Sequence, residues 1–180
     1  MNNMTTRFLR AIDWVLPHEG GYNDIKGDNG GATNYGISLV FLKSLNKDID
    51  GDGDVDKDDI KHLTPALAKE LYYDNFWKPI YEKLPELTSI KLFDTAINMG
   101  SLQAHVLLQR ALNSLGCSIK VDGLLGDETI KCFSDRKDFD VLNALCNEQV
   151  KYYIGLLSKH PEWEKFRRGW MNRANVKPKI

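Results

Sequence analysis

The amino-acid sequence predicts a mainly α-helical protein with one small irregular or β-containing lobe. Apolar residues recur at helical spacing near the N-terminus, at Phe8, Ile12 and Val15, and again along most of the chain after residue 64. Between residues 18 and 38 a glycine-rich stretch, HEGGYNDIKGDNGGATNYGIS, interrupts that periodicity and predicts turns. From Ser101 onward the pattern is again helical, so we expect a helical module at the C-terminal end.

The composition is that of an ordinary globular protein. A chain of 180 residues can bury roughly 70% of its unfolded surface, so it needs no disulfide or metal to form a core. The net charge of −1 argues against a dedicated nucleic-acid binder, and no apolar run is long enough to cross a bilayer. The chain has three cysteines, Cys117, Cys132 and Cys146, and an odd number does not suggest a disulfide framework. We expect them to be small buried hydrophobic residues of a protein in a reducing compartment.

Capping residues predict where the helices of the N-terminal half begin. Thr5 or Thr6 should cap the first helix, and Pro17 should tilt its last turn because proline lacks a backbone N–H. Ser38 should cap a second helix after the glycine-rich stretch. Thr64 followed by a proline starts another helix, which Lys78-Pro79 ends.

The second half of the chain reads as a series of helices. Pro85, with Thr88 and Ser89 as capping residues, should start one of them. The amphipathic segment SLQAHVLLQRALNSLG should end at the glycine, and VDGLLGDET supplies a turn and the start of the next helix. A long helix should run from about residue 139 to residue 157, where His160-Pro161 breaks the pattern.

The glycine-rich stretch carries residue types that glycosidic-bond cleavage needs. A carboxylic acid must protonate the glycosidic oxygen, and a second group must stabilise positive charge at the anomeric carbon or position a water. Glu19 follows apolar Trp14 and Leu16, and apolar surroundings favour a protonated carboxyl group. Asp28 lies among polar residues, which suit an ionised carboxylate, and the Thr33 hydroxyl can hold a water. The spacing of Glu19, Asp28 and Thr33 alone fits an ordinary helix end followed by a polar loop about as well as it fits a catalytic group.

The sequence EGGY, followed by ND and then DNGGATNYGI, resembles glycoside hydrolase family 108, the N-acetylmuramidase endolysins. The resemblance implies a lysozyme-like fold and cleavage of the β-1,4 bond between N-acetylmuramic acid and N-acetylglucosamine in peptidoglycan. It implies Glu19 as the catalytic acid, with Asp28 and Thr33 as further catalytic residues. It also places a D-x-x-x-N-x-G segment along the substrate groove, which makes Asn98 a substrate-binding candidate. We also expect substrate to contact Tyr22 and Tyr35.

The same resemblance covers nearly the whole chain and predicts two domains. Residues 5–97 would be the muramidase domain and residues 98–176 a peptidoglycan-binding-like helical domain, since VDGLLGDET resembles the turn of small peptidoglycan-binding modules. We expect a monomeric endolysin without a signal peptide or membrane insertion, made in the cytoplasm and acting on the wall after release. Two alternatives remain open: a lytic transglycosylase acting on the same bond, and a non-catalytic wall-binding module stabilised by calcium.

A second motif, DIDGDGDVDKDD at residues 48–59, resembles the twelve-residue calcium loop of EF-hands. Its aspartates fall at the ligand positions, and Gly53 stands where the loop must turn sharply. Aspartate at position twelve, in place of glutamate, resembles the dockerin type. We therefore expect one structural Ca²⁺ ion rather than a solvated acidic loop, with ligands from Asp48, Asp50, Asp52, Asp54 and Asp59.

Overall fold

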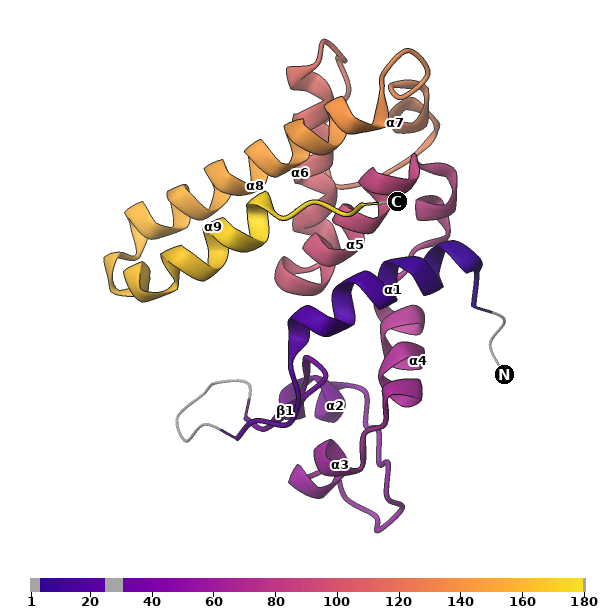
Figure 1. Cartoon of the computed structure of the whole chain (residues 1–180), viewed down its shortest axis with the longest axis vertical. Coiled ribbons are helices and arrows are strands. Elements are labelled where there is room, and N and C mark those ends of the chain that lie inside the picture. The colour runs from indigo at the N-terminus through magenta and orange to yellow at the C-terminus, as the bar shows by residue number, and fades with distance from the viewer. Residues whose placement is uncertain (1–3, 25–30, 180) are drawn as a thin grey trace. The chain divides into compact units, whose positions relative to one another are not determined.

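The computed structural model describes residues 4–24 and 31–179, which form mostly helices and one short two-stranded sheet (Figure 1). This confirms the mainly α-helical class and the small β-containing lobe. The chain divides into two compact units, Met1–Asn75 and Phe76–Ile180.

Helix α1 (Thr6–Glu19) begins as the sequence predicts. The Thr5 hydroxyl accepts a hydrogen bond from the Phe8 N–H at 3.1 Å, and Pro17 lies in the last turn. The predicted apolar face is buried, because Phe8, Ile12 and Val15 are all 0% exposed. The helix therefore ends at Glu19 with one face fixed in the core of the first unit.

A short hairpin follows α1. Strand β1 (Thr33–Asn34) pairs antiparallel with β2 (Ile37–Ser38), and Asn23 forms an isolated bridge with Thr33 through two backbone hydrogen bonds of 2.8 Å. The buried Asn34 side chain donates to the carbonyl of Ile60 at 3.0 Å. These bonds connect the hairpin both to the segment that leaves α1 and to the helix beyond the acidic loop.

Three further helices complete the first unit. Ser38 caps α2 (Leu39–Ser44), and the Thr64 hydroxyl accepts a hydrogen bond from the Leu67 N–H at 3.2 Å at the start of α4 (Pro65–Phe76). Helix α3 (Lys57–His62) follows the acidic loop. Helix α4 packs on α1, where Tyr73 meets Phe8 edge to face at 4.8 Å. The caps predicted at Ser38 and Thr64 are confirmed.

The second unit is entirely helical within the described residues, as predicted. It consists of η1 (Pro79–Lys83), α5 (Glu86–Met99), α6 (Ser101–Ser114), α7 (Asp127–Lys131), α8 (Asp138–Lys159), η2 (Pro161–Phe166) and α9 (Arg167–Asn175). Helix α5 packs against α6 and α8 and is buried from Thr88 to Ala96. Helices α8 and α9 run back along each other as a hairpin (Figure 1).

The start of α5 differs from the prediction. Thr88 and Ser89, expected as capping residues, lie inside the helix and are fully buried. The cap comes from Asp138 at the start of α8, whose carboxylate accepts hydrogen bonds from the N–H groups of Leu87 and Thr88 at 2.7 and 3.0 Å. The Thr88 hydroxyl donates to the same carboxylate at 2.6 Å. A residue about fifty positions away therefore caps this helix.

We expect Asp138→Ala to destabilise the second unit by about 1–2 kcal/mol, because it leaves several donors of α5 without an acceptor. For a chain of this size the melting temperature should fall by about 3–8 °C. Asp138→Asn keeps one acceptor oxygen and should lose less. If thermal melts of Asp138→Ala and the parent protein coincide, this carboxylate does not stabilise α5.

Buried charges connect the C-terminal segment to α5. The Lys91 side chain is fully buried, and its ammonium donates to the backbone carbonyls of Arg173 and Val176 at 2.6 and 3.0 Å. Arg173 donates to the buried Asp94 carboxylate at 2.9 Å. Burial lowers the pKa of Lys91, and the charge of Asp94 partly opposes that shift. Asp94 thus has a structural partner within the second unit.

Candidate functional site

Glu19 is the last residue of α1 and is half-buried. The next residue, Gly20, has φ +74°, a conformation that residues with a side chain rarely adopt. Gly20 therefore lets the chain turn away immediately after Glu19. The carboxylate is left at the end of a helix whose other face is anchored in the core.

Glu19 packs against the turn between β1 and β2. Tyr35 and Gly36 in this turn both have positive φ, at +51° and +76°. A Cβ atom on Gly36 would lie 2.7 Å from Glu19 Oε2 and 2.5 Å from the hydroxyl oxygen of Tyr72. That hydroxyl donates to the Tyr35 carbonyl at 2.9 Å, and Tyr72 is 1% exposed. The glycine of the YGI motif thus makes room for the side chains of Glu19 and Tyr72, which both lie against this turn.

We expect Gly36→Ala to destabilise the first unit by about 1–3 kcal/mol and to lower the peptidoglycan hydrolysis that the sequence resemblance implies by about 10²-fold. The added methyl group overlaps Glu19 and Tyr72, and the positive φ strains any residue other than glycine. Gly169→Ala is the matched control, because no atom outside its own helix lies within 4 Å of the position that the added methyl group would take. Normal clearing of a wall suspension by Gly36→Ala would contradict this view of the turn.

A groove of about 440 Å³ lies beside the end of α1. Its lining includes residues on both sides of Glu19 in the sequence, and Lys69 of α4 and Asp13 of α1 form an ion pair of 2.7 Å within it. Most of the lining is apolar or small, which suits the face of a sugar ring. The lining residues are Asp13, Leu16, Pro17, Gly20, Gly21, Tyr35, Pro65 and Lys69.

The structure places most of the other predicted site residues. Thr33 lies half-buried in β1, Tyr22 is 44% exposed just after the glycine pair, and Tyr35 lines the groove. Asp28 lies outside the described residues. Asn98 belongs to the second unit, near the end of α5, and its side-chain oxygen accepts a hydrogen bond from the Tyr153 hydroxyl at 2.5 Å. Glu19, Tyr35 and Thr33 thus come from one continuous part of the first unit.

Tyr72 is the residue at this site that sequence reasoning did not identify. Its spacing in α4 predicts a core residue, and its burial agrees with that interpretation. The hydroxyl, however, reaches the turn that carries Gly36. The tight YGI motif after Thr33 was the available signal that a side chain must approach the backbone there.

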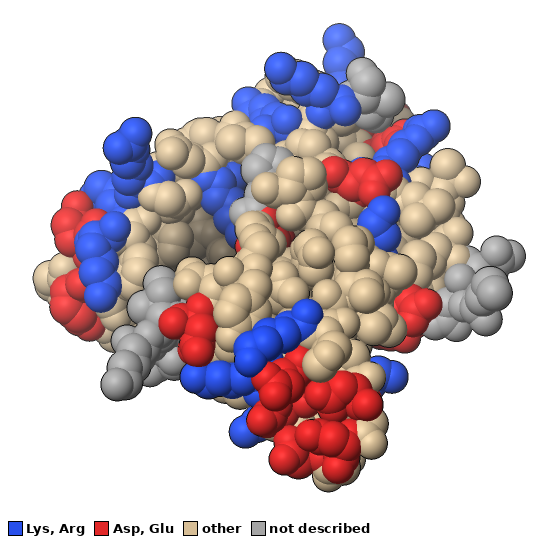
Figure 2. Space-filling view, turned by 60° about the horizontal axis from the view of Figure 1, so that its bottom comes forward, with Lys and Arg blue, Asp and Glu red and all other residues tan. Residues whose placement is uncertain are grey.

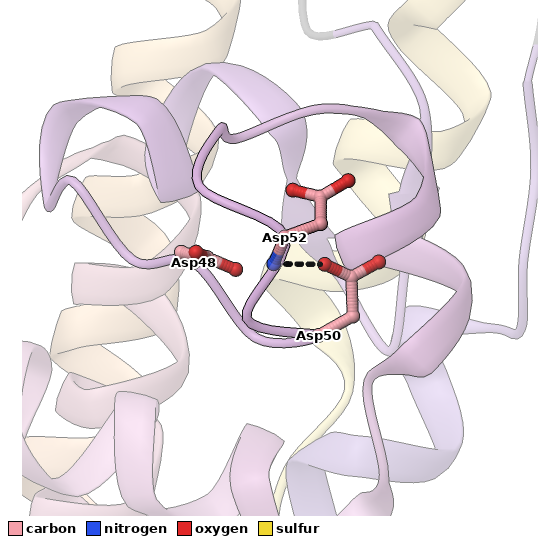
Figure 3. Close-up of side chains that lie close together, drawn as sticks. All are labelled: Asp48, Asp50 and Asp52. Atoms are coloured by element: carbon pink, nitrogen blue, oxygen red, sulfur yellow. Dashed lines mark hydrogen bonds between the residues drawn. The ribbon is translucent and has the colours of Figure 1, made fainter.

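The acidic loop lies between α2 and α3 and gathers its aspartates into two groups. Oxygens of Asp48, Asp50 and Asp52 lie within 4.8 Å of one another, and so do oxygens of Asp54, Asp56 and Asp59. Figure 3 shows the first group, in which the Asp52 N–H donates to Asp50 at 3.4 Å. Acidic side chains form one dense patch at the bottom of Figure 2. The loop therefore gathers the predicted ligands in two groups, with Asp48, Asp50 and Asp52 in the first and Asp54 and Asp59 in the second.

Backbone N–H groups hold the carboxylates of the loop in place. Asp48 accepts from Gly51 and Gly53 at 2.6 and 3.0 Å. The buried Asp59 accepts from Ile49 at 2.6 Å and from Asp56 at 2.7 Å, and it also forms part of the capping box of α3. Burial opposes ionisation of Asp59, but these backbone hydrogen bonds lower its pKa below the ordinary value. Asp59 is thus kept as a carboxylate where the loop joins the helix.

The donor set of this loop fits a hard divalent cation. It offers carboxylate oxygens, and Ca²⁺ takes six to eight oxygen ligands. Without a cation the charges repel each other: the charge of Asp52 is the main cause that raises the pKa of Asp54. The pKa of Asp50 is also raised, first because the carboxylate is partly desolvated and second because of the charge of Asp52. A bound cation would relieve this repulsion.

Comparisons with known proteins assign both parts of the chain. Residues 12–100 match the family model of glycosyl hydrolase 108, and residues 103–175 match a predicted peptidoglycan domain. The fold is similar to the solved structure of Brucella abortus SagA, with a TM-score of 0.74 and 29% sequence identity over 93% of this chain and 88% of that one. No curated protein sequence matches the chain.

The two ways of dividing the chain do not coincide. The compact units meet between Asn75 and Phe76, whereas the family matches meet near residue 100. The limits predicted from the sequence, 5–97 and 98–176, stay a prediction.

Within the described residues, no helix is both long and apolar enough to span a membrane. The chain belongs to the glycosyl hydrolase 108 family, carries a peptidoglycan domain, and is a glycoside hydrolase that acts on peptidoglycan.

Proposed function

We propose that the enzyme is an N-acetylmuramidase that hydrolyses the β-1,4 bond between N-acetylmuramic acid and N-acetylglucosamine, with Glu19 as general acid. The observation that carries this proposal is the placement of Glu19. Glu19 is half-buried and packed on the Gly36 turn, and its neighbours in the sequence, Pro17 and Gly20, line the 440 Å³ groove. A carboxyl group in such a position can meet the oxygen between two sugar rings.

In the proposed mechanism Glu19 donates its proton to the glycosidic oxygen as the bond to the anomeric carbon breaks. A water molecule then supplies the hydroxyl group of the new reducing end. The Thr33 hydroxyl, on the strand next to the Gly36 turn, is proposed to hold a water or a sugar substituent. Asp28 is proposed as the second carboxylate on the basis of the sequence motif. Tyr35 in the groove and the exposed Tyr22 offer ring faces on which a sugar can stack.

Product analysis tests this proposal. Purified sacculi are digested, clearing is followed by turbidity, and the released muropeptides are examined by mass spectrometry before and after borohydride reduction. A muramidase yields fragments with a reducible N-acetylmuramic acid end. Anhydro-muramic acid ends would instead identify a lytic transglycosylase. Reducible N-acetylglucosamine ends, or binding to sacculi without clearing, would overturn the proposal.

We also propose that the loop at residues 48–59 binds one structural Ca²⁺ ion. The carboxylates of Asp48, Asp50 and Asp52, the carbonyl of Asp54 and the carboxylate at position twelve would hold it. The grouping of the Asp48, Asp50 and Asp52 carboxylates supports the proposal. Because Asp59 also bonds to backbone amides at both ends of the loop, the ion would stiffen the segment between α2 and α3. The proposed role is structural, and no step of catalysis passes through the ion.

A further inference from the structure

Cys117 and Cys132 lie next to each other in the second unit. Cys117 follows the turn at the end of α6, and Cys132 caps the C-terminal end of α7. Cys117 Sγ is 4.0 Å from the carbonyl oxygen of Cys132, and the neighbouring Cys117 is one of the causes that raise the pKa of Cys132. Both residues are half-buried, whereas Cys146 in α8 is buried. The prediction of three buried cysteines is therefore right only for Cys146.

The two segments that carry these cysteines are held together independently of the thiols. The Arg136 guanidinium donates to the carbonyl of Cys132 at 2.6 Å and to the carbonyl of Leu115 at 2.9 Å. The Cys117 N–H donates to the carbonyl of Leu112 at 3.1 Å. One side chain thus bridges the two segments that carry the cysteines. A covalent bond between two positions that are already held close requires little rearrangement of the backbone.

We propose that Cys117 and Cys132 form a disulfide when the protein meets a small-molecule disulfide oxidant, and that this bond stabilises the peptidoglycan domain. Peptidoglycan lies outside the cytoplasm, in compartments where disulfides form and persist. An enzyme that acts on peptidoglycan meets such conditions at its substrate. The proposal rests on this place of action and not on the chemistry of Glu19.

The reaction is a thiol–disulfide exchange in two steps. Burial, together with the neighbouring Cys117, raises the pKa of Cys132 to about 11, so Cys132 is a thiol at neutral pH. Cys117 gives up its proton and attacks one sulfur of oxidised glutathione, and one glutathione thiolate leaves. Cys132 then gives up its proton and attacks Cys117 Sγ, which releases the second glutathione. The protein loses two electrons and two protons, and one glutathione disulfide becomes two glutathione thiols.

The bond would close the segment that carries the VDGLLG turn. The buried Gln109 side chain already shapes this turn, since its oxygen accepts from the N–H groups of Asp122 and Gly123 at 3.0 and 2.7 Å. A disulfide from residue 117 to residue 132 would join the segments on either side of the turn. It would restrict the unfolded chain, which is the main way in which a cross-link stabilises a fold.

The full-length protein treated with oxidised glutathione tests the proposal. The intact mass should fall by two hydrogens, free thiols measured after denaturation should fall from three to one, and a peptide map should link residue 117 to residue 132. The melting temperature should rise by about 5–10 °C. Dithiothreitol should reverse all of these changes.

Serine variants make the result specific. Cys146→Ser should still form the cross-link, whereas Cys117→Ser and Cys132→Ser should show neither the mass loss nor the rise in melting temperature. Three remaining thiols, a stable glutathione adduct on one cysteine, a link that includes Cys146, or a cross-linked protein that melts no higher than the reduced one would each overturn the proposal. None of these readouts depends on catalysis, so failure of the proposed muramidase activity would leave the test intact.

Discussion

Glu19→Gln should lower the hydrolysis of purified sacculi by about 10²–10⁴-fold, the range that general acid catalysis contributes. Glutamine has nearly the shape of glutamate and keeps an oxygen that can accept hydrogen bonds, but it cannot give a proton to the glycosidic oxygen. Because Glu19 is at a helix end and only half-buried, the exchange should leave the melting temperature within a few degrees of the parent value. Turbidity assays and thermal melts of the same preparation measure both effects.

Glu70→Gln is the matched control for that experiment. Glu70 is exposed on α4 in the same unit, so the same chemical change there should alter neither activity nor stability. Full activity of Glu19→Gln would place the catalytic acid at another residue. A large fall in the melting temperature of Glu19→Gln would instead indicate that the carboxylate mainly supports the Gly36 turn.

Calcium should raise the melting temperature of the protein, and EDTA should lower it. A ligand that binds only the folded state stabilises it by about 2.7 kcal/mol at a hundred times its Kd, which corresponds to about 5–10 °C for a chain of this size. The physical reason is that the crowded carboxylates of the loop repel each other, as the raised pKa of Asp54 indicates, and a bound cation would relieve this repulsion. Differential scanning fluorimetry across a calcium titration measures the shift, and isothermal titration calorimetry gives the number of ions bound.

Variants distinguish calcium binding at a specific site in the loop from general screening of the protein's charges by the ion. The double variant Asp48→Asn and Asp52→Asn should lose most of the calcium response. Asp135→Asn, an exposed position outside the loop, should keep it. Identical melts of the parent protein with calcium and with EDTA would remove the metal proposal, and so would a response in the double variant equal to that of the parent.

Local patterns were sufficient to predict much of this fold. Thr5, Ser38 and Thr64 cap helices within three residues of themselves, so the sequence around each one contains the whole signal. The cap of α5 could not be found in this way, because Asp138 comes from another helix. Thr88 and Ser89 resemble caps locally, but tertiary packing buries them inside the helix.

The candidate site shows the same division. The glycine pairs and the YGI motif mark Glu19 as a residue at a tight turn, and the structure places it against Gly36. The part played by Tyr72 depends on a contact between α4 and the hairpin, for which its own neighbours in sequence give no sign. The pairing of Cys117 with Cys132 likewise depends on how α6 and α7 end.

The contacts of Lys91 require a C-terminal segment of sufficient length but not of a particular sequence. Its ammonium binds main-chain carbonyls of residues 173 and 176, which every amino acid provides. Natural variants could therefore exchange Val176 freely and still satisfy the lysine. Deletion of residues 173–180 would remove both of these carbonyl acceptors and the Arg173 partner of Asp94, so the buried ion pair of Lys91 and Asp94 would lose its hydrogen bonds to the tail. Shortened forms should therefore be rare among functional relatives even where the tail sequence varies.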